Sequence, residues 1–276
     1  MRVTISTERV FSMSCFEGLR LLRKYKDIQP NISIDELISL IEKVEADGGS
    51  LDLAASVHLD SLIDEKCVLE GMQFYQICIK AILLKHQPIW SKAMRSGRKR
   101  FVQALSRNDQ DIFAAAGLMA TPPSNDIITW WDDVSGHARL ILDQSKMKQG
   151  RAAEVLTLEY ERKRLEKLGI TKEPKWPGLD DNYAGYDVLS YDLGEYGLIN
   201  RMIEVKSTSA SPLRFFVTRN EWKKAEKAMS SYYFHIWDMT KNQPVLYIRT
   251  VEEIFNHIPT DNEKGIWTIA EIPLTN

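Results

Sequence analysis

The stretch from Gly185 to Lys206 constrains the fold most strongly, because charged residues stand inside two short apolar runs. The first run reads Gly-Tyr-Asp-Val-Leu-Ser from Gly185, and the second reads Arg-Met-Ile-Glu-Val-Lys-Ser-Thr from Arg201. Short runs rich in Val, Ile, Leu and Tyr and bounded by Gly, Ser or Asn are typical of buried β-strands. The connection Asp192-Leu-Gly-Glu-Tyr-Gly197 contains two glycines that can adopt positive φ, so the two strands are expected to form a hairpin.

The charged residues of the second run allow two interpretations. Side chains alternate across a strand, so Glu204 and Lys206 should point to one face, and Ile203 and Val205 to the other. Burying such charges is costly unless they are paired or bind an ion. Glu204 and Lys206 form a structural ion pair in the first interpretation, in which Asp187 caps a turn. The second is a Mg²⁺ or Mn²⁺ site built from two carboxylates on neighbouring strands. There Lys206 would orient a water or stabilise charge developing on a phosphate.

Length and composition exclude several classes of protein. A chain of 276 residues can hold two ordinary domains or one large one, and its net charge of −2 excludes a strongly basic surface. Contact with nucleic acid must therefore come from local patches. The three cysteines are scattered and fit neither a zinc site nor a disulfide framework. The chain lacks an apolar run of membrane-spanning length and a signal-peptide pattern, so we expect a soluble, cytoplasmic protein without membrane contact.

Residues 1–148 are predicted to form an α-helical recognition or interaction domain. Ser33 reads as an N-cap followed by early acids, and a long helical pattern spans roughly Ser61 to Leu84. The segment Ala120-Thr-Pro-Pro-Ser-Asn125 breaks this half ahead of a new helix. Trp130 and Trp131 follow, and we interpret them as packing anchors rather than as a base-stacking platform.

Basic residues gather in two places. The denser patch lies between Trp90 and Leu105 and includes Arg98, Lys99 and Arg100. It is either a solvated helix face or a contact with phosphates, and the second would make binding salt-dependent. Weaker candidates for phosphate contact stand at the start of a later helix; they are Arg219, Lys223 and Lys224.

A helix is predicted from Gly150 to Leu168, with Gly169 as its C-terminal stop. At about 100° per residue, Glu154 and Glu161 both fall on its apolar face. Glu154 could instead stay hydrated in the first turn, where the helix dipole favours an acid, and Glu161 could pair with an arginine. In the alternative interpretation, Glu154 supplies a third carboxylate ligand to a metal site on the strands.

The rest of the chain alternates strands with one clear helix. Thr218-Arg-Asn-Glu221 matches a capping box, which gives Glu221 a structural explanation, so we do not count it as catalytic. His235 and His257 have no partner at ligand spacing and stay unassigned. Strands are predicted over 213–217, 232–239, 244–249 and 265–272.

The order of these elements resembles the PD-(D/E)XK nuclease superfamily, the fold of many restriction enzymes and Holliday-junction resolvases. It runs from a helix with a glutamate to a strand with an aspartate and a strand with Glu-x-Lys, followed by strand, helix and strand. The family's leading Pro-Asp is here Tyr186-Asp187, a frequent substitution in the superfamily. Four strings between about Gly150 and Arg249 resemble one branch, the family named for the carboxy-terminal part of the plant NO VEIN protein: Gly150-Arg-Ala-Ala-Glu154, Gly185-Tyr-Asp-Val-Leu-Ser190, Ile203-Glu-Val-Lys-Ser207 and Val217-Thr-Arg-Asn-Glu-Trp222 followed by Ala225.

The resemblance implies an α/β fold over residues 149–276, with a restriction-endonuclease-like core in which helices flank a mixed central sheet. The α-helical domain of residues 1–148 would precede this nuclease-like domain. Carried over residue by residue, the resemblance implies metal binding by Asp187 and Glu204 and a catalytic role for Lys206. It also implies a supporting catalytic and metal-binding role for Glu154.

The function favoured by these features is a Mg²⁺-dependent (or Mn²⁺-dependent) endonuclease that hydrolyses phosphodiester bonds. DNA is the expected substrate, although the sequence does not exclude RNA. The alternative is a catalytically inactive module of the same fold that binds DNA or a protein partner. The resemblance further implies restriction or antiviral defence, with an operon-encoded protein partner. Many nucleases of this superfamily act as dimers, so a homodimer is a further expectation.

Overall fold

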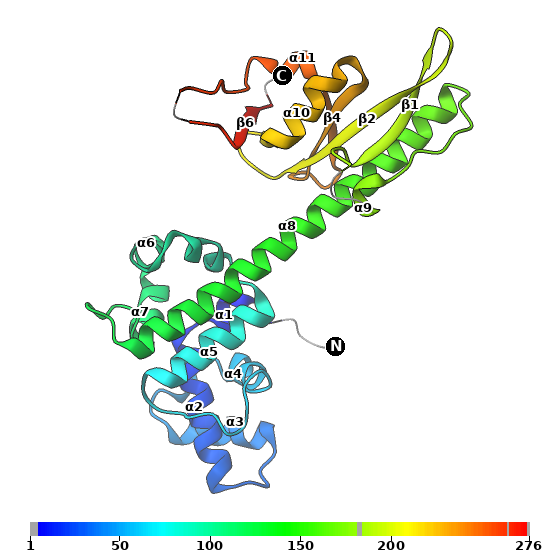
Figure 1. The fold of residues 1–276 in the computed structure, drawn as a ribbon. Helices are drawn as coiled ribbons and strands as arrows, with labels where there is room; N and C mark the ends of the chain where they lie inside the picture. The colour runs from blue at the N-terminus through cyan, green and yellow to red at the C-terminus, as the bar shows by residue number, and fades with distance from the viewer. Residues whose placement is uncertain (1–4, 181–183, 264, 275–276) are drawn as a thin grey trace. The chain divides into compact units, whose positions relative to one another are not determined.

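The computed structural model describes residues 5–180, 184–263 and 265–274. The chain divides into two compact units, Met1–Gln144 and Ser145–Asn276. Figure 1 shows a helical first unit and a second unit built around a sheet. Helix α8 (Asn125–Lys167) begins in the first unit and ends in the second.

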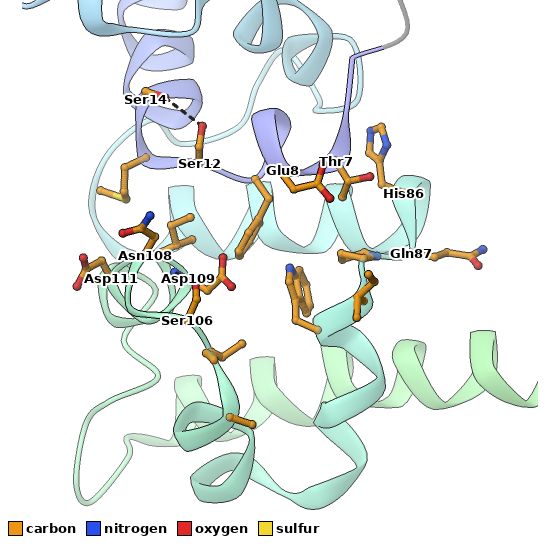
Figure 2. A pocket seen from close by; sticks show the side chains of 18 residues that line it. Thr7, Glu8, Ser12, Ser14, His86, Gln87, Ser106, Asn108, Asp109 and Asp111 are labelled. Atoms are coloured by element: carbon orange, nitrogen blue, oxygen red, sulfur yellow. Dashed lines mark hydrogen bonds between the residues drawn. The ribbon is translucent and has the colours of Figure 1, made fainter. Parts of the chain in front are cut away.

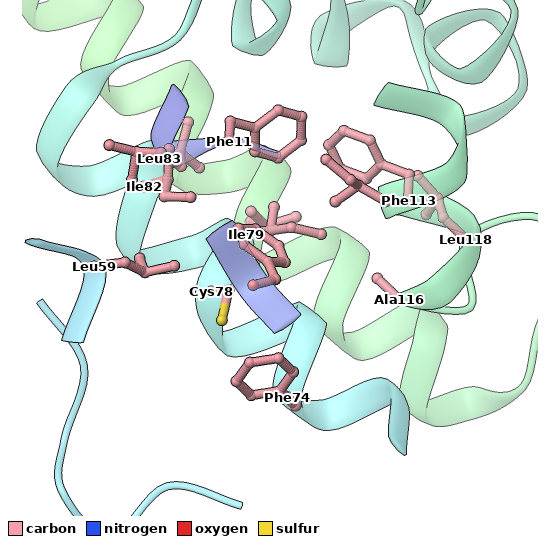
Figure 3. Packing of buried hydrophobic residues seen from close by; sticks show 14 of the residues in the cluster. Phe11, Leu59, Phe74, Cys78, Ile79, Ile82, Leu83, Phe113, Ala116 and Leu118 are labelled. Atoms are coloured by element: carbon pink, nitrogen blue, oxygen red, sulfur yellow. The ribbon is translucent and has the colours of Figure 1, made fainter. Parts of the chain in front are cut away.

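The first unit is helical throughout its described residues and encloses one main apolar core. Helix α5 (Gly71–His86) lies at its centre. Figure 3 shows Phe74, Ile79 and Leu83 of this helix among Phe11 and Phe113 from other segments. The elements ahead of α8 are α1 (Thr7–Val10), α2 (Met13–Ile28), α3 (Ile34–Val44), η1 (Gly48–Ser50), α4 (Leu53–Asp60), α5 (Gly71–His86), η2 (Ile89–Ser96), α6 (Arg98–Ala104) and α7 (Arg107–Ala115).

Two sequence predictions for this unit are confirmed. Ser33 caps α3 in a capping box with Glu36, which satisfies two backbone N–H groups at the helix start. Trp130 and Trp131 are 9% and 8% exposed and pack in the core, as expected for packing anchors. The helical character predicted for this half of the chain therefore holds.

The predicted helix from Ser61 to Leu84 is wrong at its start. Helix α4 ends at Asp60, and α5 begins only at Gly71. The buried guanidinium of Arg23 donates hydrogen bonds to the carbonyl oxygens of Ile63 and Asp64, at 3.1 and 2.8 Å. These two carbonyl oxygens accept hydrogen bonds from a distant side chain rather than from the backbone of a helix. Sequence periodicity does not reveal such a tertiary contact.

The helix predicted from Gly150 is also wrong at its start, because α8 begins at Asn125. Glycine lowers helix stability by only about 1 kcal/mol relative to alanine, so packing on both sides carries the helix through Gly150. The predicted C-terminal end of this helix agrees better with the structure: α8 ends at Lys167, and Gly169 follows with φ +72°. The predicted boundary between residues 148 and 149 thus falls within a continuous helix.

The second unit contains a mixed four-stranded sheet in the order β1-β2-β4-β5. The pairs β1–β2 and β4–β5 are antiparallel, whereas β2 and β4 are parallel. Strands β3 and β6 form a separate antiparallel pair. The elements after α8 are α9 (Pro177–Asp180), β1 (Val188–Gly194), β2 (Gly197–Thr208), β3 (Arg214–Thr218), α10 (Arg219–Ala228), η3 (Met229–Ser231), β4 (Tyr232–Asp238), β5 (Val245–Thr250), α11 (Val251–Phe255) and β6 (Ile269–Pro273).

Each face of the sheet packs against a different helix. Ile203 and Val205 of β2 pack with Ala153 of α8 in one core cluster. Strand β4 contributes Phe234 to a second cluster, together with Trp222 of α10. Since side chains alternate along β2, Glu204 and Lys206 point to the α10 side. The predicted α/β class, a mixed sheet flanked by helices after a helical region, is confirmed.

The described helices include none that is both long enough and apolar enough to cross a membrane.

Candidate active site

Asp187 and Glu204 are brought together by the pairing of β1 with β2. Asp187 directly precedes β1, and its backbone N–H donates to the carbonyl of Ile203 at 2.9 Å. Its Oδ2 accepts a hydrogen bond of 2.7 Å from the backbone N–H of Val205. Two backbone contacts on either side of Glu204 therefore fix Asp187 beside it, as the hairpin prediction required.

Lys206 lies between two carboxylates. Its Nζ is 2.8 Å from Glu204 Oε1 and 2.8 Å from Glu221 Oε2. Glu221 also caps α10, because its Oε2 accepts the backbone N–H of Thr218 at 2.9 Å. The ion pair of the first interpretation is thus present, but it belongs to a cluster in which carboxylates outnumber cations.

Tyr232, the first residue of β4, closes the other side of Glu204. Its hydroxyl donates to the carbonyl of Gly185 at 2.9 Å and lies 3.3 Å from Glu204 Oε2. Both oxygens of Glu204 therefore have polar neighbours, one from Lys206 and one from Tyr232. Glu204 is 6% exposed, so these neighbours replace the water that a surface carboxylate would have.

Glu154 lies further from this cluster, on α8. Its Oε2 accepts hydrogen bonds from Trp176 Nε1 at 2.6 Å and from Arg151 Nη1 at 2.8 Å. Its carboxylate is nevertheless near enough to Asp187 to raise the pKa of that residue. Glu154 is thus placed as an acid at the border of the site, and its role as a metal ligand stays a prediction.

The acids of the site are hard to ionise without a further cation. Burial raises the pKa of Asp187, and Glu154 adds to that rise, while the hydrogen bond from Val205 opposes it. Burial also raises the pKa of Glu204; Lys206 lowers it, and Asp187 and Glu221 raise it further. Clustered carboxylates with raised pKa values are a common feature of functional sites.

Lys206, unlike the acids, is stabilised in its charged form. Burial alone would lower its pKa, but the carboxylates of Glu204 and Glu221 raise it above the ordinary value. Its ammonium group is therefore protonated at neutral pH, so Lys206 can donate hydrogen bonds or stabilise negative charge. It is not suited to act as a general base.

The residues present fit a hard divalent cation only in part. Carboxylate oxygens are the ligands that Mg²⁺ and Mn²⁺ prefer, and burial raises the pKa values of Asp187 and Glu204, a cost of ionisation that a bound cation would offset. Among the described residues, however, no three His, Cys, Asp or Glu side chains come close enough to form a complete ligand set. Asp187 and Glu204 are the two that could hold the ion.

The predicted phosphate-binding residues differ in their surroundings. Arg98 Nη1 donates to the carbonyls of Leu118 and Ala120, at 2.6 and 2.9 Å, and thus supports the local fold. Lys99 and Arg100 are exposed. These two can reach a ligand without giving up such contacts, and their binding of nucleic acid stays a prediction.

The predicted contacts at the start of α10 are less favourable. The guanidinium of Arg219 forms a two-pronged ion pair with Asp261 and lies over the ring of Trp267. The charge of Lys223 also reaches Asp261, because it lowers the pKa of that carboxyl together with Arg219. Both residues therefore face an acid outside the catalytic cluster.

A large cavity lies in the helical unit, away from the residues predicted to be catalytic. Its volume is about 1000 Å³, and Figure 2 shows Glu8, Asp109 and Asp111 among its eighteen lining residues. The lining contains these three carboxylates and, within the described chain, neither lysine nor arginine. A phosphate backbone would be repelled there, so this cavity does not support nucleic-acid binding.

A second ionic network is buried on the opposite, α8-facing side of the sheet. Glu161 is fully buried; its Oε2 accepts hydrogen bonds from Arg164 Nε at 2.6 Å and from Ser190 Oγ at 2.7 Å. The predicted pairing of Glu161 with an arginine is thus confirmed. His235 lies nearby with its Nε2 3.6 Å from Glu161 Oε1, and burial, with Arg201 and Arg164, lowers the pKa of His235 to about 3.

Two residues of the cluster escaped sequence analysis. Glu221 was fully explained as a cap, and nothing in the sequence shows that one carboxylate oxygen also meets Lys206. Tyr232 stands in a predicted strand, and only the parallel pairing of β2 with β4 brings it to Glu204. The sequence signal that could have pointed to Glu221 was the Thr-Arg-Asn-Glu string, because this string is part of the family resemblance.

Comparison with known proteins supports the interpretation of this unit. No curated protein and no solved structure showed significant similarity to the chain. A family model described as Protein NO VEIN, C-terminal, matches residues 153–248, a range that contains Glu154, Asp187, Glu204 and Lys206. The resemblance stated from the sequence is thereby confirmed: this segment matches the NO VEIN carboxy-terminal family, which is a PD-(D/E)XK-like nuclease domain.

Proposed function

We propose that the protein is a metal-dependent nuclease that hydrolyses phosphodiester bonds in DNA. The observation that carries the proposal is the convergence of Asp187 and Lys206 on the buried Glu204 on one side of the sheet. The family match supports the same chemistry, because all three residues lie in the matched range.

Asp187 and Glu204 would hold Mg²⁺ or Mn²⁺ with their carboxylate oxygens. When bound, the ion would polarise the scissile phosphate and lower the pKa of a water molecule. Lys206, protonated and fixed by Glu204 and Glu221, would direct its remaining N–H donor toward the phosphate or the attacking water. Val205 contributes through its backbone N–H, which orients the carboxylate of Asp187.

Cleavage assays with matched variants test this function. The full chain is incubated with plasmid, linear and single-stranded DNA and with RNA, in Mg²⁺, in Mn²⁺ and in excess chelator. We expect Asp187→Ala, Glu204→Ala and Lys206→Ala each to lower the cleavage rate by about 100-fold or more, since each removes a transition-state contact. Glu195→Gln, at the exposed hairpin turn, should cleave like the wild type. Equal cleavage by wild type and variants, or activity in excess chelator, would refute the mechanism.

The second candidate function is a catalytically inactive module that binds DNA or a protein. One observation favours it: Lys206 already has two carboxylate partners, as in a structural ion cluster. Thermal unfolding with and without Mg²⁺ or Mn²⁺ separates the two functions. A nuclease site gains stability from the bound ion by ligand linkage, and the Glu204→Ala variant loses that gain. An inactive module shows the same unfolding temperature in each case.

A further inference from the structure

The charge of the candidate site poses a problem for a polyanionic substrate. Three carboxylates, those of Asp187, Glu204 and Glu221, share a single ammonium group, that of Lys206. One divalent cation would leave this cluster without net positive charge. Phosphates on either side of the scissile bond therefore need positive side chains close by.

A small cavity beside the cluster supplies such side chains. Its volume is about 360 Å³, and Tyr186, Lys224, Lys227 and Tyr232 are among the residues that line it. Tyr232 connects the cavity with the site, because its hydroxyl lies 3.3 Å from Glu204 Oε2. Tyr186 makes a second connection as the residue that precedes Asp187 in the chain.

Helix α10 places both lysines on the side of the site. Residues three apart lie near one another on a helix surface, so Glu221, Lys224 and Lys227 follow one line along α10. Glu221 at the start of that line holds Lys206. Lys223 lies about 100° away from Lys224, on the part of the helix whose charge reaches Asp261.

The backbone is shaped to admit Lys224. A Cβ atom built on Gly185 would be 2.8 Å from Lys224 Cγ and 2.9 Å from its Cδ, so the lysine stem lies directly across this glycine. Gly185 also has φ +79°, a conformation that side chains other than glycine rarely adopt. The same turn carries Asp187, so the position of Lys224 is tied to that of the metal-binding carboxylate.

Both ammonium groups are available for a ligand. Lys224 and Lys227 are exposed, and within the described residues neither lies within 4.0 Å of a carboxylate. Arg219 on the same helix differs, because its guanidinium is paired with Asp261. A cation that is not already paired gives up no ion pair when it binds a phosphate.

We propose that Lys224 and Lys227, with the ring of Tyr186 beside them, form the subsite that binds the DNA backbone next to the scissile phosphate. This inference rests on the proposed nuclease function. Of the three candidates predicted at the start of α10, it keeps Lys224, adds Lys227 and leaves out Arg219 and Lys223.

The test measures DNA binding without cleavage. A fluorescent DNA duplex is titrated with the full chain in excess chelator, and the dissociation constant is followed over a range of KCl concentrations. We expect Lys224→Gln and Lys227→Gln each to weaken binding about threefold to tenfold, and to reduce the slope of log K against log salt by about one. Lys223→Gln is the matched control on the same helix and should bind within about twofold of the wild type.

Several outcomes would overturn the inference: wild-type affinity and slope in both lysine variants, an equal loss in Lys223→Gln, or the absence of DNA binding by the wild type. Because the readout needs no catalysis, failure of the nuclease proposal stays distinguishable. A protein that binds DNA through Lys224 and Lys227 but cleaves nothing with any metal would retain the subsite and lose the proposed reaction.

Discussion

Single residues in the site serve two purposes, and Glu221 illustrates this best. Its Oε2 accepts the backbone N–H of Thr218, which caps α10, and meets the ammonium group of Lys206. The carboxylate therefore links the start of a helix to a residue in the middle of β2. Each purpose depends on a different property, since the cap needs a hydrogen-bond acceptor and Lys206 needs negative charge.

Substitution of Glu221 can separate these properties. Glutamine can still accept the hydrogen bond of a capping box, so Glu221→Gln should keep thermal stability within about 0.5 kcal/mol of the wild type. Its loss of charge should lower the cleavage rate by about tenfold, because one counter-charge that orients Lys206 is removed. Glu221→Ala should lose the cap as well, at a cost of about 1 kcal/mol. Unfolding and cleavage measured on both variants check this, and a glutamine variant with full activity would contradict it.

Glu204 should destabilise the metal-free protein at neutral and higher pH. Its folded pKa, like that of Asp187, is raised above the unfolded values of 4.5 and 3.8, so the folded state keeps protons that the unfolded state loses. The free energy of unfolding then falls as pH rises from about 4 through the raised folded values. Glu204→Gln should therefore unfold at a higher temperature than the wild type in chelator at pH 8, with a smaller difference near pH 4. A variant that is less stable at pH 8 would contradict the assigned direction.

Sequence analysis reached those site residues whose placement depends on local structure. Asp187, Glu204 and Lys206 lie on one hairpin, and the strand period of two is enough to put Glu204 and Lys206 on one face. Tyr232 depends on the pairing of β2 with β4, and Glu221 on the packing of α10 near β2; both contacts join residues far apart in the chain. No periodicity encodes these contacts, so these two residues could not be predicted.

At the scale of elements, the second ionic network holds α8 against the β1–β2 hairpin. Arg164 of α8 donates to Glu161, to Asp192 of β1 and, at 2.6 Å, to the carbonyl of Tyr191. Arg201 of β2 adds a contact with Asp192 at 3.2 Å. Because α8 also carries Glu154, this network helps to position the acid at the border of the site.

Removing Arg164 should loosen this attachment. Arg164→Met leaves the buried Glu161 with the more distant cation of Arg201, whose Nε is 3.7 Å from Oε1, and breaking such a pair costs about 3–5 kcal/mol. Hydrogen exchange of the β1 and β2 amides should accelerate, and the unfolding temperature of the second unit should fall. Lys163→Met, an exposed neighbour on the same helix, is the control and should match the wild type. Equal stability of the two variants would show that the network does not hold the hairpin.

Elements were predicted well where their boundaries follow from residue chemistry. The hairpin turn at Gly194 and Gly197, the N-cap at Ser33 and the capping box at Thr218 appear as expected. The new helix predicted after residues 120–125 begins as expected, but its continuation through Gly150 was missed, because a single glycine does not end a helix that is packed at both ends. The order of strands β1-β2-β4-β5 likewise results from packing against two helices rather than from local signals.

The whole molecule combines a nearly neutral charge with local differences between its two units. The net charge is −2, and the cavity of the helical unit has an acidic lining. The proposed DNA binding must therefore depend on local groups of exposed cations. In the predicted segment of residues 98–100, Lys99 and Arg100 are exposed, whereas the guanidinium of Arg98 holds two backbone carbonyls.

Variants of the basic segment of residues 98–100 should divide into two groups. Lys99→Gln and Arg100→Gln should weaken binding to a DNA duplex and reduce its salt dependence, with stability within about 0.5 kcal/mol of the wild type. Arg98→Gln should mainly lower stability, by about 1–3 kcal/mol, because two partly buried carbonyls lose their donor. Fluorescence anisotropy and thermal unfolding of the full chain distinguish the groups. Unchanged DNA affinity in both exposed variants would assign the segment to the solvated surface.

The convergence of Asp187 and Glu204 on a divalent cation is tested most directly by diffraction from a crystal of the full chain soaked in Mn²⁺. We predict an anomalous difference peak between the carboxylates of Asp187 and Glu204, and its loss in the Glu204→Gln variant. Absence of the peak from the wild-type crystal, or a peak of equal height at that position in the variant, would contradict the proposed metal site.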